Sequence, residues 1–373
     1  SVFSSALAAD LFIASAGCQI IPHDPDAVHP TGSSSQQTTA ATSDDHSNSE
    51  STKTTSASIT EATTTHEQPT ETGLPDNDLL RRQMQGMSLE AKIGQLIMAG
   101  YNTAAEAEQL VRELSPGGLI LFRRNIRTEQ QTREDIASFQ AAVAAGLPPL
   151  FIAVDQEGGT VSILPASVGY FESAWEIGLR ADVPYAVASG EQTGLILRDW
   201  GFNVNCAPVL DIGGNPDNKV IGTRAYGETA DTVIVYGLAV LQGLQNTGML
   251  AAVKHFPGHG GTAVDSPLSL PVIDLSLADL QKEALRPFIA AIDAGTDMVM
   301  MAHIRFSQLD ELPASLSPVL VDALLRQELG FSGVVLTDDL TMSAITNQYE
   351  IGEAAVLAVE AGFIGPDGQW HHW

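Results

Sequence analysis

The sequence contains few basic residues and few cysteines. It has 18 Lys and Arg against 45 Asp and Glu, which gives a formal net charge of −27 at pH 7. Phosphate backbones and anionic membrane surfaces repel a chain with this charge, so nucleic-acid binding is excluded. The two cysteines, Cys18 and Cys206, are too few for a disulfide framework and lack the spacing of a zinc site.

Long apolar runs are also absent. No run reaches the roughly 18 apolar residues of a membrane-spanning helix, so a polytopic membrane protein is excluded. Hydrophobic residues still make up 44% of the chain, which is enough for a large core. The length of 373 residues exceeds that of an ordinary domain. One (β/α) barrel of about 250 residues with an appendage accounts for this length.

The appendage is predicted at the N-terminal end of the chain. Residues 31–72 include 22 Ser or Thr among 42 residues, with almost no large apolar side chains and no periodicity. A stretch of this composition cannot bury a core. We therefore expect residues 19–78 to form a disordered linker.

Residues 1–18 resemble the later part of a bacterial lipoprotein signal peptide. An apolar run from Ala6 ends in small residues directly before Cys18. By this resemblance, Cys18 receives a diacylglyceryl group after cleavage, and the linker tethers an extracytoplasmic domain to the bacterial cell membrane. The alternative is an N-terminal extension with an incidental cysteine.

From Leu79 onward, short β-rich runs alternate with helical patterns, which is typical of repeated βα units and a parallel sheet. Seven strands are predicted, at residues 96–101, 118–122, 150–154, 203–209, 250–253, 297–302 and 333–336. Helical periodicity is present at residues 128–145, 232–247, 277–294 and 318–329. Ser88 is the predicted N-cap of a further helix.

The pattern breaks off where an eighth strand is due. After a helix predicted at residues 353–361, the last residues, 362–373, include glycines and a proline and make a poor strand. The predicted fold class is α/β, a (β/α)8 barrel of the TIM type over residues 79–373. We expect the eighth βα unit to be missing or degraded, with the chain truncated or frame-altered after residue 362.

Polar residues directly follow five of the seven predicted strands. They are Asp155, Asp211, Lys254 with His255, His303, and Asp338 with Asp339. In a barrel of this kind the active site lies at the carboxyl ends of the strands. A carboxylate at the mouth of a dry barrel, with cations opposite, suits the stabilisation or capture of a cationic carbon centre, as in glycoside hydrolysis.

Several ordered motifs resemble the family 3 glycoside hydrolases, in the branch of the bacterial β-N-acetylglucosaminidases (β-N-acetylhexosaminidases). The motifs are Asp155-Gln156-Glu157-Gly158-Gly159, Ile221-Gly222-Thr223-Arg224, Lys254-His255-Phe256-Pro257-Gly258-His259-Gly260 and Thr337-Asp338-Asp339-Leu340. The resemblance covers about residues 87–362. It implies hydrolysis of N-acetylglucosamine-containing glycans without a cofactor or metal.

Carried over by position, the resemblance makes Asp338 the nucleophile that forms a covalent glycosyl-enzyme. Asp339 is the rival, but neighbouring strand residues point in opposite directions, so only one of the two should face the barrel mouth. We expect Lys254 and Arg224 to lower the pKa of this carboxylate. The resemblance assigns substrate binding to Asp155, Arg224, Lys254 and His255.

The family pattern fails at the general acid/base. The branch carries Asp-Ser-His after its Gly-rich loop, whereas this chain has Asp265-Ser266-Pro267. Proline has no proton to donate. Asp265 is the nearest substitute. His303 is expected either near the acetamido group of the substrate or as an anchor at its own strand, and Cys206 is expected in the core.

Two functions follow from these observations. The first is a lipid-anchored glycosidase that removes terminal, non-reducing β-linked N-acetylglucosamine from peptidoglycan-derived or related glycans by a retaining mechanism. The second is a catalytically impaired sugar-binding homologue, because Pro267 stands where the family has its acid/base histidine.

Overall fold

The structure is a computed structural model of the chain, and it describes residues 11–16, 77–261 and 270–363. The chain divides into two units, and the barrel belongs to the one formed by Ser1–Ile20 and Asp78–Trp373. The predicted linker falls almost wholly outside the described residues, as do Cys18, Asp265, Pro267 and residues 364–373. None of the described helices is long and apolar enough to cross a membrane.

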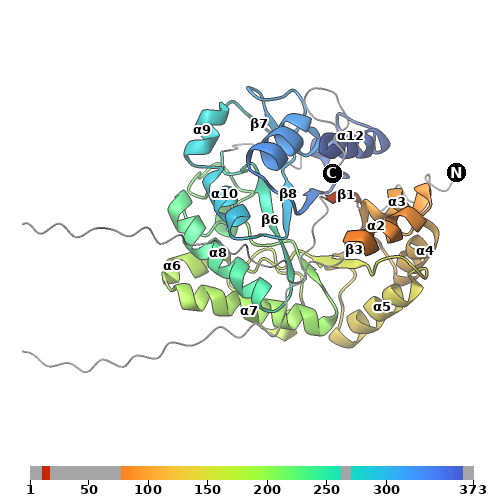
Figure 1. The fold of residues 1–373 in the computed structure, drawn as a ribbon. Helices are drawn as coiled ribbons and strands as arrows, with labels where there is room; N and C mark the ends of the chain where they lie inside the picture. Colours follow the sequence, from red (N-terminus) through yellow and green to blue (C-terminus); the bar gives the residue numbers. More distant parts are fainter. Residues whose placement is uncertain (1–10, 17–76, 262–269, 364–373) are drawn as a thin grey trace, which may run out of the picture. The chain divides into compact units, whose positions relative to one another are not determined.

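Eight strands form a closed barrel in the order β1-β10-β8-β6-β5-β4-β3-β2 (Figure 1). Their bounds are β1 Leu11–Ala16, β2 Ile97–Ala99, β3 Gly118–Leu121, β4 Phe151–Val154, β5 Val204–Asn205, β6 Leu250–Phe256, β8 Met298–Met301 and β10 Val334–Thr337. The seven barrel strands other than β1 pair in parallel with one another. The seven predicted strands and the predicted fold class are confirmed.

The eighth strand position is filled by the N-terminal segment, which was expected to be part of a signal peptide. Strand β1 runs antiparallel to both neighbours. Its first half pairs with β2, with Ile13 opposite Ile97, and its second half with β10, with Ala14 opposite Leu336. Residues 364–373, where an eighth βα unit would begin, lie outside the described residues, so its expected absence stays a prediction. The expected start of the barrel at residue 79 was wrong, since Leu11–Ala16 is part of it. An apolar segment of six residues can satisfy both unpaired sheet edges, which removes the cost of leaving their backbone groups open.

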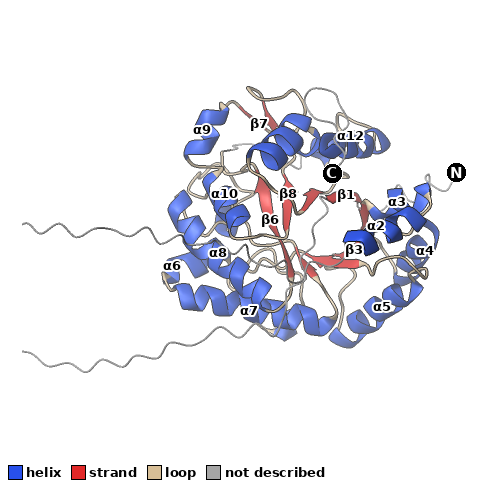
Figure 2. Cartoon of the chain, viewed as in Figure 1, coloured by secondary structure: helices blue, strands red, loops and turns tan. Residues whose placement is uncertain are grey.

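Helices surround the strands (Figure 2). Their bounds are α2 Asn77–Gly86, α3 Leu89–Gln95, α4 Ala104–Leu114, α5 Glu129–Ala142, α6 Ala174–Arg180, α7 Val183–Trp200, α8 Ala230–Asn246, α9 Leu277–Lys282, α10 Arg286–Asp293, α11 Ser343–Thr346 and α12 Ile351–Phe363. Shorter elements are η1 Ala166–Val168, η2 Gly222–Arg224, η3 Ala314–Leu316, the π-helix η4 Val319–Glu328, and the two-stranded sheet of β7 Val272–Ile273 and β9 Arg305–Phe306.

Local sequence explains where these helices begin and break. The Ser88 hydroxyl accepts a hydrogen bond of 3.2 Å from the Ala91 amide, so the predicted N-cap of α3 is confirmed. The single helix predicted at residues 277–294 was wrong, because it is broken into α9 and α10. Glu283 leaves helical geometry at the end of α9, and Pro287, which has no N–H to donate, stands in the first turn of α10.

The core has two layers that follow the alternation of side chains along the strands. One cluster of buried residues fills the barrel interior, and it includes Ile120 of β3, Met298 and Met300 of β8, and Cys206. The intervening strand residues belong to a larger cluster, which packs against the helices. Cys206 is wholly buried, and burial raises the pKa of its thiol, so the described structure places it in the core, as expected.

Candidate active site

The inward face of the barrel continues beyond its apolar interior into three polar side chains. The interior cluster includes Ala153 of β4, Ala252 of β6 and Leu336 of β10. Two positions further along each strand are Asp155, Lys254 and Asp338. Because strand side chains alternate with a period of two, all three project inward at the carboxyl end of the barrel. This is the end where (β/α)8 barrels carry their active sites.

Lys254 joins two carboxylates at the centre of this group. Its Nζ atom lies 2.5 Å from Oδ1 of Asp155 and 2.6 Å from Oε1 of Glu157. The Lys254 side chain is only 3% exposed. Burial by itself lowers the pKa of Lys254, but the charges of Asp155 and Glu157 outweigh it and raise the pKa. The ammonium group is therefore held charged in the barrel mouth.

Glu157 also binds Arg224, in the bidentate geometry that suits a guanidinium and a carboxylate. The Nε–Oε2 distance is 2.8 Å and the Nη2–Oε1 distance is 2.9 Å. Burial raises the pKa of Glu157, but Lys254 and Arg224 overcome this effect and lower it to about 2. Glu157 thus connects two of the predicted sugar-binding cations.

A glycine allows Glu157 to reach this position. Gly158 has φ +97°, and a Cβ atom there would lie 2.0 Å from the carbonyl oxygen of Glu172. Only glycine fits a backbone with that torsion and that close approach. The following loop is held by Gln156, whose Oε1 atom accepts hydrogen bonds from the amides of Ile163 and Leu164.

His255 lies beside Lys254 because strand β6 is irregular there. The register with β8 shifts between Lys254 and Phe256, which lets consecutive side chains both reach the site. The Lys254–His255 and Phe256–Pro257 peptide bonds are cis. The Nε2 atom of His255 lies 3.3 Å from Nη2 of Arg224, and its Nδ1 atom lies 2.6 Å from Oδ2 of Asp211. The structure thus brings together the four residues predicted to bind the sugar.

Asp338 follows β10 and has one carboxylate oxygen fixed by the backbone. Its Oδ1 atom accepts a hydrogen bond of 2.8 Å from the Asp339 amide. Within the part of the chain that the structure describes, its Oδ2 atom makes no hydrogen bond. Burial raises the pKa of Asp338, but His303, His255, the Asp339 amide and Lys254 together lower it. Asp338 is therefore ionised at neutral pH.

Lys254 lowers the pKa of Asp338, as expected, but it is not the strongest influence, and Arg224 is not among the main ones. The reason is that the guanidinium of Arg224 is paired with Glu157, and the ammonium of Lys254 is shared by two other carboxylates.

The side chains of Asp339 and His303 are held by hydrogen bonds to other protein groups. Oδ1 of Asp339 accepts hydrogen bonds from the amide and the hydroxyl of Thr341, at 2.8 and 2.7 Å. Nε2 of His303 lies 2.9 Å from the Asp339 carbonyl oxygen, and Nδ1 lies 2.7 Å from the Ser315 hydroxyl. Both ring nitrogens of His303 are thus bound by protein, which favours its anchoring role over contact with an acetamido group.

Glu157 and Asp211 are the site residues whose roles the sequence did not predict. Both lie close to the ends of predicted strands, but no interaction partner was predicted for either from the sequence. A buried carboxylate requires a cation or several N–H donors, and this requirement is the signal that could have pointed to them. His259 shapes the loop, since its amide donates to Asp211 and its carbonyl accepts from Asn218.

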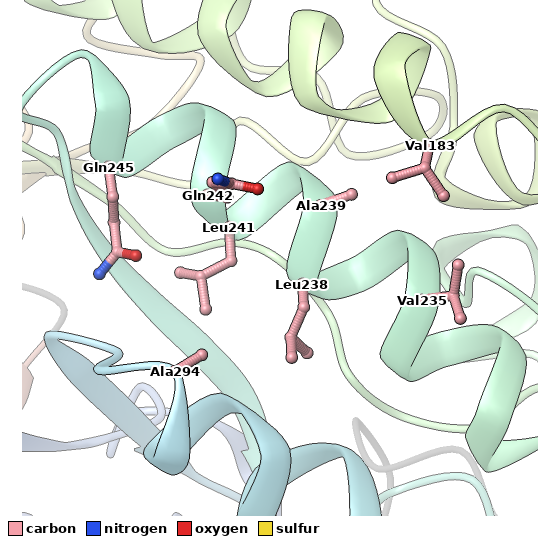
Figure 3. A pocket seen from close by; sticks show the side chains of 8 residues that line it. All are labelled: Val183, Val235, Leu238, Ala239, Leu241, Gln242, Gln245 and Ala294. Carbon is pink, nitrogen blue, oxygen red and sulfur yellow. The ribbon is translucent and has the colours of Figure 1, made fainter. Parts of the chain in front are cut away.

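A separate surface pocket lies on the outer helices, between α8 and the end of α10 (Figure 3). Its volume is about 400 Å³, and it is lined by Val183, Val235, Leu238, Ala239, Leu241, Gln242, Gln245 and Ala294. None of these residues is titratable at neutral pH. The pocket therefore offers no acid, base or nucleophile, and the candidate active site remains the barrel mouth.

Known proteins share this arrangement of sequence and fold. The profile described as "Glycosyl hydrolase family 3 N terminal domain" matches residues 88–364, which is more than half of the chain. The chain belongs to glycoside hydrolase family 3. It is 35% identical to the "Beta-hexosaminidase A" of Pseudoalteromonas piscicida over 277 residues, which cover 69% of this chain and 46% of that protein. It is also 35% identical to the "Beta-hexosaminidase" of Stenotrophomonas maltophilia over 254 residues, which cover 66% of this chain and 74% of the relative.

Solved family 3 structures resemble the barrel. A β-N-acetylglucosaminidase from a Paenibacillus species has 43% sequence identity and a TM-score of 0.72, over 74% of this chain and 54% of that one. NagZ from Neisseria gonorrhoeae, solved in complex with N-trifluoroacetyl-D-glucosamine, has 33% identity and a TM-score of 0.64, over 70% and 78%. The chain thus spans about half the length of the Pseudoalteromonas and Paenibacillus proteins.

Proposed function

We propose that the chain hydrolyses terminal, non-reducing β-linked N-acetylglucosamine from glycans. The observation that carries this proposal is the carboxylate of Asp338, which projects inward at the barrel mouth with Oδ1 held by the Asp339 amide and with its pKa lowered. Further support comes from the family 3 relatives that are β-hexosaminidases and from the N-acylated glucosamine bound by the Neisseria protein.

In the proposed mechanism, Oδ2 of Asp338 attacks the anomeric carbon of the bound sugar while the bond to the leaving oxygen breaks. The leaving oxygen takes a proton from a general acid, and an ester between Asp338 and the sugar results. Water then attacks the anomeric carbon and gives a proton to the conjugate base of the same group, while the ester bond breaks and releases the Asp338 carboxylate. Two inversions lead to retention of configuration. The hydrogen bond from the Asp339 amide fixes Oδ1 and orients Oδ2 for this attack.

The first step needs a general acid that protonates the leaving oxygen. We assign this role to Asp265, the acidic residue nearest to Pro267 in sequence; both lie outside the described residues. Asp155, Arg224, Lys254 and His255 are assigned to the sugar hydroxyls. Each hydroxyl left unpaired in a closed site would cost about 1–3 kcal/mol, which explains a dense set of charged donors and acceptors.

The alternative function is a sugar-binding homologue with impaired catalysis, and Pro267 is the observation that favours it. Loss of general-acid catalysis removes a rate factor of ~10²–10⁴. The loss affects mainly substrates with poor leaving groups.

Comparison of two substrates separates the two functions. A 4-nitrophenyl β-N-acetylglucosaminide needs little protonation of its leaving group, whereas N,N′-diacetylchitobiose and a peptidoglycan-derived disaccharide need it fully. An active glycosidase cleaves all three in an Asp338-dependent way. An impaired homologue cleaves only the aryl substrate or binds N-acetylglucosamine without turnover. Absence of both hydrolysis and N-acetylglucosamine binding contradicts the proposed function.

For the location, we propose attachment to the bacterial cell membrane through lipid on Cys18, outside the cytoplasm. The support is the sequence pattern before Cys18. Cleavage at this cysteine would remove strand β1, so the mature protein contains either the lipid or the strand. The mass of the N-terminal peptide of protein made in a bacterial host distinguishes a diacylglyceryl-modified Cys18 from an uncleaved chain.

A further inference from the structure

A buried carboxylate lies behind the candidate sugar site. Asp211 is only 1% exposed. Its Oδ2 atom accepts hydrogen bonds from Nδ1 of His255 at 2.6 Å and from the His255 amide at 3.2 Å. Its Oδ1 atom accepts one of 2.6 Å from the His259 amide. Burial raises the pKa of Asp211, but the neighbouring His255 and the N–H donors lower it overall, so the group is ionised.

An ionised carboxylate can only accept hydrogen bonds. The nitrogen of His255 that faces Asp211, which is Nδ1, must therefore carry a proton. The other ring nitrogen, Nε2, lies 3.3 Å from Nη2 of Arg224. A guanidinium always donates, so Nε2 is the acceptor of that contact. Asp211 and Arg224 thus both require the neutral tautomer of His255 that carries its proton on Nδ1.

This tautomer decides what His255 offers to a ligand. Lys254 and Arg224 already supply N–H donors at the barrel mouth, and Asp155 supplies an acceptor. A His255 side chain with its proton on Nδ1 has one acceptor lone pair, at Nε2, which the Arg224 N–H contacts at 3.3 Å in this structure. A sugar hydroxyl that donates to Nε2 replaces this long contact, while Arg224 stays held by its two hydrogen bonds to Glu157.

We propose that Asp211 is a positioning residue for substrate recognition, which holds His255 in the Nδ1–H tautomer so that Nε2 accepts a hydrogen bond from a sugar hydroxyl. The identity of the sugar rests on the proposed function. The tautomer itself does not, and it can be measured in the free protein.

Asp211 has a second, structural contact, with the amide of His259, and the experiment has to separate the two. Asn218 provides the matched control, because its Nδ2 atom donates to the His259 carbonyl at 2.9 Å and so supports the same loop. Asn218→Ala loosens this loop and leaves the contact between Asp211 and His255 in place. Asp211→Asn keeps the size of the side chain but cannot accept on both of its terminal atoms.

The test records two-bond ¹H–¹⁵N spectra of the full chain with ¹⁵N-labelled histidine, and the His255 signals are assigned by their loss in His255→Gln. We expect the Nδ1–H tautomer in the unsubstituted protein and in Asn218→Ala, and a mixed or Nε2–H tautomer in Asp211→Asn. An Nε2–H tautomer in the unsubstituted protein overturns the proposal, even if Asp211→Asn does not fold. An equal change in Asn218→Ala and Asp211→Asn overturns it as well.

Kinetics on the aryl N-acetylglucosaminide provides the second readout. We expect Asp211→Asn to raise KM about tenfold with a smaller change in kcat, as loss of a ground-state contact does. In the His255→Gln background the same substitution should change KM by less than about threefold, because Asp211 then has no tautomer to control. An equal effect in both backgrounds contradicts the positioning role. If the protein does not hydrolyse this substrate, the proposed function fails, while the tautomer measurement still decides this proposal.

Discussion

Arg224 holds the carboxylate of Glu157 through two hydrogen bonds of 2.8 and 2.9 Å, although the two residues lie 67 positions apart in the sequence. Glu157 also binds Lys254, so one buried carboxylate fixes two cations of the candidate sugar site. Removal of one partner of a buried ion pair leaves the other charges unpaired, which typically costs about 3–5 kcal/mol. The site is therefore coupled to the stability of the barrel.

The first prediction concerns the pH dependence of stability. The pKa of Glu157 is lowered from 4.5 to about 2 in the folded protein. Glu157 binds its proton more tightly in the unfolded chain than in the folded protein. The stabilisation from ionised Glu157 is therefore complete above pH 4.5 and is lost as the pH falls to about 2. A difference of this size corresponds to about 3 kcal/mol. We expect Glu157→Gln to lower the free energy of unfolding by that order at pH 7 and to flatten its pH dependence in this range.

Urea unfolding between pH 7 and pH 3 measures this effect. Glu129→Gln is the control, because Glu129 pairs with Arg133 at the surface with 54% of its side chain exposed, and such pairs contribute about 0–1 kcal/mol. If Glu157→Gln and Glu129→Gln have the same small effect, Glu157 is not the link between the two cations that the geometry indicates.

The second prediction distinguishes the neighbouring aspartates. Asp338→Asn should reduce turnover of an aryl N-acetylglucosaminide by ~10³-fold or more, because an amide cannot form the ester intermediate. Asp339→Asn should retain more than a tenth of the activity, since the Asp339 carboxylate binds Thr341. Both variants should have the thermal transition of the unsubstituted protein within a few degrees. If Asp338→Asn kept its activity and Asp339→Asn lost it, Asp339 and not Asp338 would be the nucleophile.

The third prediction concerns the missing acid/base. We expect Pro267→His to raise the rate on N,N′-diacetylchitobiose by ~10²-fold or more, with a smaller effect on the aryl substrate, because histidine supplies a proton near neutral pH. Equal rates of the two proteins on the disaccharide would mean that another group, with Asp265 as our candidate, already acts as the acid. The double variant Asp265→Asn, Pro267→His then tests whether that group is Asp265.

The fourth prediction concerns strand β1. A chain that starts at Cys18 lacks Leu11–Ala16 and exposes the edges of β2 and β10 that β1 covers. Loss of this strand should lower the free energy of unfolding by several kcal/mol. We therefore expect the chain that starts at Cys18 to melt ~10 °C below the full chain and to aggregate more readily. Coincident melting curves would show that β1 does not stabilise the barrel.

The parts of the molecule that follow from short-range periodicity could be predicted from the sequence. The seven parallel strands are short apolar runs, and the period of two places Asp155, Lys254 and Asp338 on the inward face. Antiparallel closure by Leu11–Ala16 could not be predicted, because a short apolar run before a cysteine is compatible with both a signal peptide and a strand. Its pairing partners lie more than 80 residues away along the chain.

The links between the site residues were also not predictable, for a different reason. Glu157 reaches the site from a loop rather than from the inward face of a strand, and its position depends on the positive φ of Gly158. Asp211 finds its partner His255 44 residues further along the chain. No local pattern contains such pairings, although the cost of burying an unpaired carboxylate requires that each has a partner.

Covalent capture of Asp338 tests its assignment as the nucleophile. A fluorinated N-acetylglucosaminyl fluoride forms the glycosyl ester and slows its hydrolysis, so the ester accumulates on the nucleophile. Peptide mass spectrometry after this treatment should find a single sugar adduct on Asp338, and Asp338→Asn should carry none. An adduct on Asp339, on Asp155 or on another residue, or hydrolysis of the aryl substrate without any adduct, would contradict the assignment of Asp338 as the nucleophile.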